Sequence, residues 1–251
     1  MSRYLNDLLS SQDLTPAEIQ ALQNLRNQIQ GQLSTLSGDP RFYYAGSYGK
    51  KTMIKARYDL DIVVYWPHTT SYTIKEIYDA AGNVLKKYWT SVNSKTVCWE
   101  LPFKSGFHID VVPGRALDDK YYEANLYRTD TKTTLKTSLK KHIKTVEASE
   151  RISAIRLMKL WRERRKVPFQ KSFLLELMTI EACKGIRTDD YHTQVMSSLK
   201  YIQDNIINCQ LRDPANTNNF LADDLNMERR TKIKAAAGSA LMATSWDHIF
   251  G

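Results

Sequence analysis

The spacing of apolar residues changes along the chain. Between residue 41 and about residue 137, short runs of alternating apolar and polar residues are typical of β-strands, at residues 41–44, 58–66, 96–101, 107–112 and 121–129. Beyond about residue 135, apolar residues recur three or four positions apart, which is typical of helices, at residues 152–161, 173–183 and 195–207. The pattern therefore predicts a strand-rich N-terminal half and a helical C-terminal half.

Two helices are predicted before and within the strand-rich half. Thr15 can cap a first turn, Pro16 is favoured at the first helical position, and Glu18 can complete a capping box. This helix should continue to about residue 36 and end before a Gly-Asp-Pro sequence. Residues 74–89 also have helical spacing, although Gly82 lowers the helix propensity of that segment.

These elements predict an α+β fold with two domains. Residues 1–137 should form a long N-terminal helix and a core with a mixed sheet and flanking helices, and residues 138–251 should form a helical domain. Residues 212–219 interrupt the helical pattern of the second domain. We expect ligand chemistry in a cleft between the two domains.

Three aspartates interrupt apolar strands. Asp59 and Asp61 stand two positions apart at the start of one predicted strand, so both project from one face, and Asp110 lies within another strand. Crowded carboxylates raise one another's pKa or recruit a cation, and Mg²⁺ prefers such oxygen ligands. An isolated Asp-x-Asp sequence is more often a strand end, but the third aspartate favours a two-metal phosphoryl-transfer site. His108 is interpreted as pointing to the other face of its strand and is left out of this site.

A Gly-Ser pair precedes the aspartates. Gly46 lets the backbone approach a phosphate, and Ser47 can donate a hydrogen bond and cap the following helix. A P-loop is excluded, because Gly46 and Gly49 are too close for G-x-x-x-x-G-K-[ST] and Lys50 is followed by Lys51. A Gly-Ser pair alone is compatible with an ordinary loop. Together with the aspartates it predicts a site for the triphosphate of a nucleotide.

The order of these motifs resembles that of the DNA polymerase β-like nucleotidyltransferases. The run GSYGKKTMIKARYDLD at residues 46–61 is similar to the corresponding run in 2′-5′-oligoadenylate synthases and in the bacterial cyclic-oligonucleotide synthases (CD-NTases) of anti-phage (CBASS) signalling systems. Residues 156–161, 171–177 and 212–219 resemble the helical half of that family, so the similarity extends from about Phe42 to Ala243. The resemblance implies a polymerase β-like core followed by an oligoadenylate synthase-like helical domain.

The resemblance also implies a reaction and residue roles. A ribose hydroxyl attacks the α-phosphate of a nucleoside triphosphate and pyrophosphate leaves. Asp59 and Asp61 bridge two Mg²⁺ ions, for which Mn²⁺ is the alternative, and Asp110 binds the hydroxyl-side ion and serves as, or next to, the general base. The resemblance also implies that Lys159 and Ser172 contact the triphosphate, in addition to Gly46, Ser47 and Lys50. Phe173, next to Ser172, is a candidate for the base pocket.

Composition and charge limit the class of partner. Lys and Arg total 36 against 27 Asp and Glu, and the net charge of +9 favours polyanions such as nucleotides or RNA. The three cysteines, Cys98, Cys183 and Cys209, fit neither a disulfide framework nor a zinc pair and are interpreted as buried and reduced. The first residues lack the layout of a signal peptide, and no apolar run has the length of a membrane span. We therefore expect a cytoplasmic monomer or weak dimer without a membrane partner.

Three functions remain open on the sequence. The first is synthesis of a cyclic di- or oligonucleotide second messenger in anti-phage defence, with RNA or a protein as an optional activator. The second is synthesis of linear 2′-5′ oligoadenylate, or nucleotidyl transfer to RNA or another acceptor. The third, an inactive nucleotide- or RNA-binding module, gives no reason for three crowded carboxylates. The basic run at residues 162–166 is either a phosphate-binding surface or the cationic end of a helix.

Overall fold

The computed structural model describes residues 2–251, residue 2 by its backbone alone, and divides into two compact units. The sheet unit comprises Leu14–Lys51 and Tyr58–Ile143. The helical unit comprises the described residues up to Asp13, together with Thr52–Arg57 and Lys144–Gly251. The sequence predicts a boundary after residue 137; in the structure, residues 2–13 and 52–57 belong to the helical unit and residues 138–143 to the sheet unit. Residue 1 of the expected first domain lies outside the described residues.

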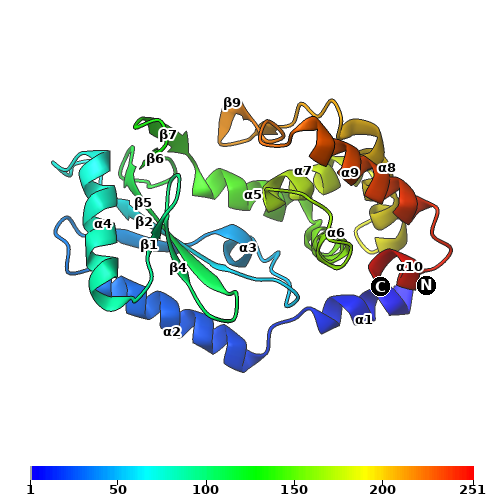
Figure 1. Ribbon diagram of the computed structural model, residues 1–251, viewed down its shortest axis with the longest axis horizontal. Coiled ribbons are helices and arrows are strands. Elements are labelled where there is room, and N and C mark those ends of the chain that lie inside the picture. Colours follow the sequence, from blue (N-terminus) through cyan, green and yellow to red (C-terminus); the bar gives the residue numbers. More distant parts are fainter. Residues whose placement is uncertain (1) are drawn as a thin grey trace. The chain divides into compact units, whose positions relative to one another are not determined.

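The sheet unit is built on a mixed, seven-stranded sheet (Figure 1). Its strands follow the order β1-β2-β5-β4-β3, while β6 pairs with the end of β5 and β7 pairs with β6. The pair β2 and β5 is parallel and the other pairs are antiparallel. The strands are β1 (Arg41–Tyr44), β2 (Leu60–Trp66), β3 (Asn93–Ser94), β4 (Trp99–Pro102), β5 (His108–Ala116), β6 (Ala124–Tyr127) and β7 (Thr134–Thr137).

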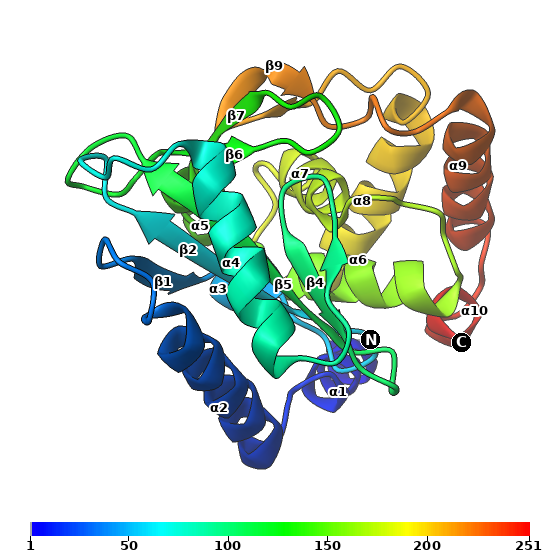
Figure 2. The same ribbon diagram turned by 60° about the vertical axis from the view of Figure 1, so that its left-hand side comes forward.

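Helix α4 (Ile74–Tyr88) packs against β5 and β6, and α2 (Pro16–Leu33) packs against α4 (Figure 2). The capping box predicted at Thr15 is confirmed, and α2 ends three residues before the predicted limit. The packing of α4 accounts for Gly82, because a Cβ atom there would lie 2.2 Å from the ring of Trp99. The indole of Trp99 donates a hydrogen bond to the carbonyl oxygen of Tyr78, at 2.9 Å, so the helix and the sheet are held together at this point.

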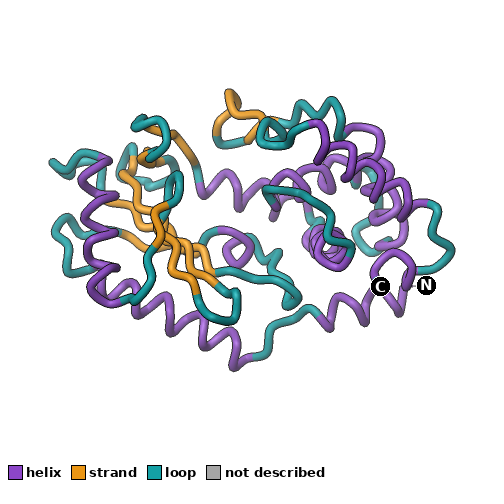
Figure 3. The backbone as a smooth tube through the Cα atoms, viewed as in Figure 1, coloured by secondary structure: helices purple, strands orange, loops and turns teal. Residues whose placement is uncertain are grey.

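The helical unit contains most of the remaining helices (Figure 3). Helix α1 belongs to this unit because its buried Leu5, Leu8 and Leu9 share one core with Trp161 and the apolar faces of α6 to α9. Helix α5 begins in the sheet unit and ends in the helical unit. The helices are α1 (Ser2–Ser11), α5 (Leu139–Ser149), α6 (Ile152–Arg164), α7 (Ser172–Ala182), α8 (Tyr191–Asn205), α9 (Met227–Leu241) and α10 (Trp246–Phe250).

Residues 212–219, predicted to interrupt the helices, form the hairpin of β8 (Arg212–Asp213) and β9 (Asn216–Phe220). Cys98, Cys183 and Cys209 are buried free thiols, as predicted. Within residues 2–251, every helix is too short or too polar to cross a bilayer. The α+β fold with a mixed sheet and a helical C-terminal part is therefore confirmed.

Candidate active site in the sheet unit

The structure brings the predicted aspartates together at one end of two parallel strands. Asp61 of β2 lies directly opposite Asp110 of β5, and Asp59 comes immediately before the first residue of β2. Because successive side chains of a strand alternate between its faces, Asp59 and Asp61 project from the same face. Three carboxylates thus lie close together at one end of the inner strands β2 and β5.

The carboxylates are electrostatically strained. The pKa of Asp61 is raised to about 6, first by burial and then by the negative charges of Asp110 and Asp59. Burial also raises the pKa of Asp110, against the opposing effect of the nearby Lys95 ammonium. A divalent cation among these oxygens would replace repulsion with attraction, and oxygen ligands of this kind suit Mg²⁺. The donor set therefore fits the metal ions that the sequence predicts.

Gly46 contacts Asp61 so closely that no other residue fits there. Its φ is +53°, and a Cβ atom would lie 1.6 Å from Oδ2 of Asp61. The backbone N–H of Ala45 donates to the carbonyl oxygen of Asp61, at 2.9 Å, which joins the Gly-Ser turn to β2. The buried Lys50, at the end of the same turn, lowers the pKa of Asp61 through its positive charge. The turn and the aspartates are thus one structural feature.

The expectation that Ser47 caps the next helix is wrong. Helix α3 (Gly46–Gly49) begins one residue earlier, its N-cap is Ala45, and no side chain makes the capping hydrogen bond. The helical turn already includes Gly46, so it begins before Ser47 is reached. Ser47 therefore lies in the first turn, next to the glycine that contacts Asp61.

The exclusion of His108 is also wrong. Residues two positions apart in a strand share a face, so His108 lies on the same side of β5 as Asp110. Its Nε2 atom lies 3.6 Å from Oδ2 of Asp59. Ligand atoms of Glu100, His108 and Asp110 all lie within 4.8 Å of one another.

Glu100 and Lys95 are two further charged residues at this end of the strands that sequence reasoning missed. Glu100 of β4 lies directly opposite Asp110 in the antiparallel pair with β5. The Lys95 ammonium contacts Glu100 and lies 3.3 Å from Oδ1 of Asp110. The available signal was a charged residue between Trp99 and Leu101 in a predicted strand, but only the strand register shows which residue it faces.

The other predicted nucleotide contacts belong to the helical unit. Lys159 is almost fully buried, forms an ion pair with Glu176 at 2.7 Å, and donates to the hydroxyl of Thr52 at 2.8 Å. The Ser172 hydroxyl accepts a hydrogen bond of 2.6 Å from Arg162, and Phe173 packs partly buried against the helical core. Lys159 thus contributes a buried ion pair to the fold of this unit.

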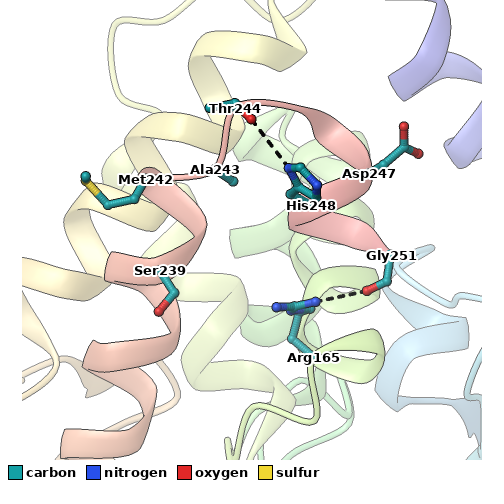
Figure 4. Close-up of a pocket in the computed structure, with 8 residues that line it drawn as sticks. All are labelled: Arg165, Ser239, Met242, Ala243, Thr244, Asp247, His248 and Gly251. Carbon is teal, nitrogen blue, oxygen red and sulfur yellow. Dashed lines mark hydrogen bonds between the residues drawn. The ribbon is translucent and has the colours of Figure 1, made fainter.

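The basic run at residues 162–166 is largely engaged within the helical unit. Arg162 is buried and pairs with Glu163, while Arg164 and Arg165 donate to the carbonyl oxygens of Phe250 and Gly251, at 2.9 and 3.1 Å. These contacts favour the interpretation as the cationic end of α6 over that of a free phosphate-binding surface. Arg165 also lines an open pocket of about 500 Å³ beside α9 and α10, which contains none of the predicted site residues (Figure 4).

Comparisons with solved structures show the same fold. The structure of CdnC from E. coli MS115-1 with ATP is 20% identical, covers 96% of this chain and 94% of its own, and has a TM-score of 0.72. The CD-NTase CdnG of Bradyrhizobium diazoefficiens in complex with GTP is 15% identical over 98% of this chain and 94% of its own, with a TM-score of 0.74.

The DncV cyclic AMP-GMP synthase of Vibrio cholerae, in complex with a linear intermediate, is 18% identical. The match covers 100% of this chain and 84% of DncV, with a TM-score of 0.69. At these identities the likeness establishes the fold alone. Among curated protein sequences, none is similar enough to count as a match.

A family model gives the closer assignment. The model of the SMODS domain, described as Second Messenger Oligonucleotide or Dinucleotide Synthetase domain, matches residues 1–149. That segment includes Gly46, Asp59, Asp61 and Asp110, and it is more than half of the 251 residues. The chain therefore belongs to the Second Messenger Oligonucleotide or Dinucleotide Synthetase domain family.

Proposed function

We propose that this chain is a Mg²⁺-dependent nucleotidyltransferase that joins ribonucleoside triphosphates into a cyclic di- or oligonucleotide second messenger. The observation that carries the proposal is the placement of Asp61 beside Asp110 on parallel strands, next to Asp59 and the side-chain-free Gly46. Membership of the SMODS family supports the product class. An inactive binding module would gain nothing from a buried Asp61 whose pKa is raised by its neighbours.

Two metal ions would be held by Asp59, Asp61 and Asp110. When bound, they make the attacking hydroxyl easier to deprotonate and neutralise charge on the leaving phosphates. Asp110 would hold the ion on the side of the attacking hydroxyl and would receive the proton of the ribose hydroxyl, directly or through a neighbouring group. Gly46 leaves room at the backbone for a phosphate, and Ser47 and Lys50 can donate hydrogen bonds to it.

In the helical unit, Lys159 and Ser172 are proposed as triphosphate contacts on the strength of the sequence resemblance, and Phe173 as a base contact because it is next to Ser172. The hydrogen bond from Arg162 supports this role for Ser172. Because a guanidinium can only donate, the Ser172 oxygen is the acceptor and its own proton is free to point to a phosphate. For Lys159 the proposal requires that its ammonium exchange part of its contact with Glu176 for a phosphate oxygen.

We place this activity in anti-phage signalling in the cytoplasm, with the chain as a monomer or weak dimer. CdnC has been determined in a complex with HORMA, and this supports a protein activator as the alternative to RNA. An activator would then act on synthesis without supplying any of the three aspartates.

The test is product analysis with the purified full chain. All four ribonucleoside triphosphates are supplied with Mg²⁺ or Mn²⁺, pyrophosphate release is measured, and products are separated after phosphatase treatment. A phosphatase-resistant product supports cyclic synthesis, whereas phosphatase-sensitive oligonucleotides indicate linear 2′-5′ or 3′-5′ chains. The same assay with added RNA tests transfer to an RNA end. Consumption of nucleotide that is equal in wild type and Asp61→Asn would contradict the assignment of the site.

A further inference from the structure

A second group of metal-ligating side chains lies next to the aspartates. Ligand atoms of Glu100, His108 and Asp110 are within 4.8 Å of one another. Metal–ligand bonds of about 2.1 Å place ligand atoms about 3 to 4 Å apart around an octahedral ion. The three side chains are therefore separated by little more than a shared cation requires, and small rotations close the difference.

The sheet register explains this convergence. Glu100 lies opposite Asp110 across β4 and β5, and His108 lies two residues before Asp110 on the same face. Leu60 pairs with Ile109, so the residues before them, Asp59 and His108, face each other across β2 and β5. Nε2 of His108 lies 3.6 Å from Oδ2 of Asp59. The His108 imidazole thus lies between Asp59 on one side and Glu100 and Asp110 on the other.

A positive charge already occupies the group. The Lys95 ammonium contacts Glu100 and lies 3.3 Å from Oδ1 and 3.5 Å from Oδ2 of Asp110. The Lys95 side chain is 39% exposed, while those of Glu100, His108 and Asp110 are each about one-fifth exposed. A flexible, partly solvated lysine can leave such a position without disturbing the strands that carry the three ligands.

We infer that Glu100, His108 and Asp110 form a site for a divalent transition-metal ion such as Mn²⁺, and that this ion displaces Lys95. The imidazole carries the specificity, because nitrogen donors suit transition metals, whereas Mg²⁺ prefers oxygen ligands. Lys95 serves as the built-in counterion of the metal-free site. The inference rests on the proposed function in one respect only: Asp110 is also taken as a ligand of the two catalytic metal ions.

The competing explanation is an ion-pair network with His108 as a hydrogen-bonding support for Asp59. The two explanations differ in what touches the ion. A ligating His108 places a nitrogen on the metal, so that its removal weakens Mn²⁺ binding more than Mg²⁺ binding. A supporting His108 leaves an all-oxygen metal site, so that its removal leaves the preference between the two ions unchanged.

The decisive experiment uses the purified full chain, stripped of metal with a chelator and titrated with Mn²⁺ alone, without nucleotide. Electron paramagnetic resonance counts bound Mn²⁺, and electron spin-echo modulation detects a ligating ¹⁴N. We expect nitrogen modulation in wild type and its loss in His108→Ala, with Mn²⁺ affinity reduced at least about tenfold. Mg²⁺ affinity, measured by competition, should change far less. Absence of nitrogen modulation in wild type overturns the inference.

Two further variants test the carboxylate and the counterion. Glu100→Gln should weaken both Mn²⁺ and Mg²⁺, because it removes a charged oxygen ligand, and Lys95→Met should strengthen both. Unchanged or weaker Mn²⁺ binding in Lys95→Met contradicts the displacement of Lys95. His68→Ala and Lys136→Met are matched controls, since His68 lies 3.5 Å from Asp119 and Lys136 forms an ion pair with Glu123, both elsewhere in the sheet unit.

Folding, metal binding and nucleotide consumption are measured separately for each variant. Circular dichroism of each variant, with His108→Gln as a milder substitution, checks that the sheet unit remains folded. If Mn²⁺ binds through nitrogen but no nucleotide is consumed, the proposed function fails while this inference stands. If nucleotides are consumed but His108→Ala keeps full Mn²⁺ affinity, this inference fails while the proposed function stands.

Discussion

A Cβ atom on residue 46 would lie 1.6 Å from Oδ2 of Asp61, so the missing side chain of Gly46 is what allows Asp61 to occupy its place. The φ of +53° at Gly46 is a second reason for glycine, because other L-residues adopt this region at a cost of about 1 kcal/mol. Gly46, which precedes the aspartates in the sequence, is thus in direct contact with Asp61. Its role is to shape the carboxylate site as well as to admit a phosphate.

Gly46→Ala is therefore expected to abolish nucleotidyl transfer by moving Asp61. The methyl group cannot be accommodated by a flexible neighbour, because the atoms that it meets are the carboxylate and Cβ of Asp61 itself. We expect the rate of pyrophosphate release to fall at least about a hundredfold, since a displaced catalytic group costs that much. Steady-state kinetics at saturating nucleotide measures the loss.

Gly106→Ala is the matched control for backbone strain. Gly106 also has a positive φ, of +86°, but a Cβ atom there would meet no other atom within 4 Å. This variant should lose about 1 kcal/mol of stability and keep its rate. A loss of rate in Gly106→Ala as large as that in Gly46→Ala would show that backbone strain, and not contact with Asp61, determines the effect.

Asp61→Asn should stabilise the metal-free protein. The carboxylate is ionised at neutral pH in a place where burial and two negative neighbours raise its pKa to about 6. Each pKa unit of such a shift corresponds to about 1.4 kcal/mol, so the neutral amide is expected to gain roughly 1–3 kcal/mol. Chemical denaturation in the presence of a chelator measures the free energy of unfolding. The same substitution should abolish catalysis.

The gain from Asp61→Asn should depend on pH in a defined direction. Because the pKa of Asp61 is higher in the folded chain than its ordinary value of 3.8, ionisation costs stability as the pH rises from about 4 through 6. The difference between variant and wild type should thus be small at pH 4 and largest above pH 7. Asp59→Asn is the control, since the Asp59 side chain is 37% exposed and its neutralisation should bring a smaller gain. A lower stability of Asp61→Asn at pH 8 would show that local cations outweigh the repulsion.

Helix α4 offers a test of the fold alone. Gly82→Ala should destabilise the sheet unit by about 1–3 kcal/mol, because the added methyl group would overlap the Trp99 ring, which is fixed by its hydrogen bond to Tyr78. Gly31→Ala in α2 is the control, since a Cβ atom at Gly31 would have no neighbour within 4 Å. That substitution should raise stability by about 0.5–1 kcal/mol through helix propensity. Thermal unfolding of both variants decides whether contact or propensity dominates.

Periodicity and turn chemistry predicted most of the elements because both are local properties of the chain. The Thr15 capping box and strand β2, which contains Asp61, are examples. What was missed depends on pairing between distant segments. Glu100 faces Asp110 through the register of β4 and β5, and α1 joins the helical unit mainly through burial of its leucines against α6 and α8. The misplacement of His108 had a different cause, since alternation along the strand already puts it on the face of Asp110.

The buried pair of Lys159 and Glu176 allows the structural and nucleotide-binding roles of Lys159 to be separated. Glu176→Gln leaves a buried ammonium without its carboxylate and should cost about 3 kcal/mol or more, measured by chemical denaturation. The double variant Lys159→Met/Glu176→Leu removes both charges and should recover part of that loss, because an apolar pair of similar size is often tolerated. Thr52→Val, added to the double variant, removes the hydroxyl that would otherwise lose both partners.

If Lys159 contacts the triphosphate, ATP affinity by calorimetry should fall at least about tenfold in these folded variants, as loss of a charged contact predicts. Unchanged ATP affinity would assign Lys159 to the fold of the helical unit alone.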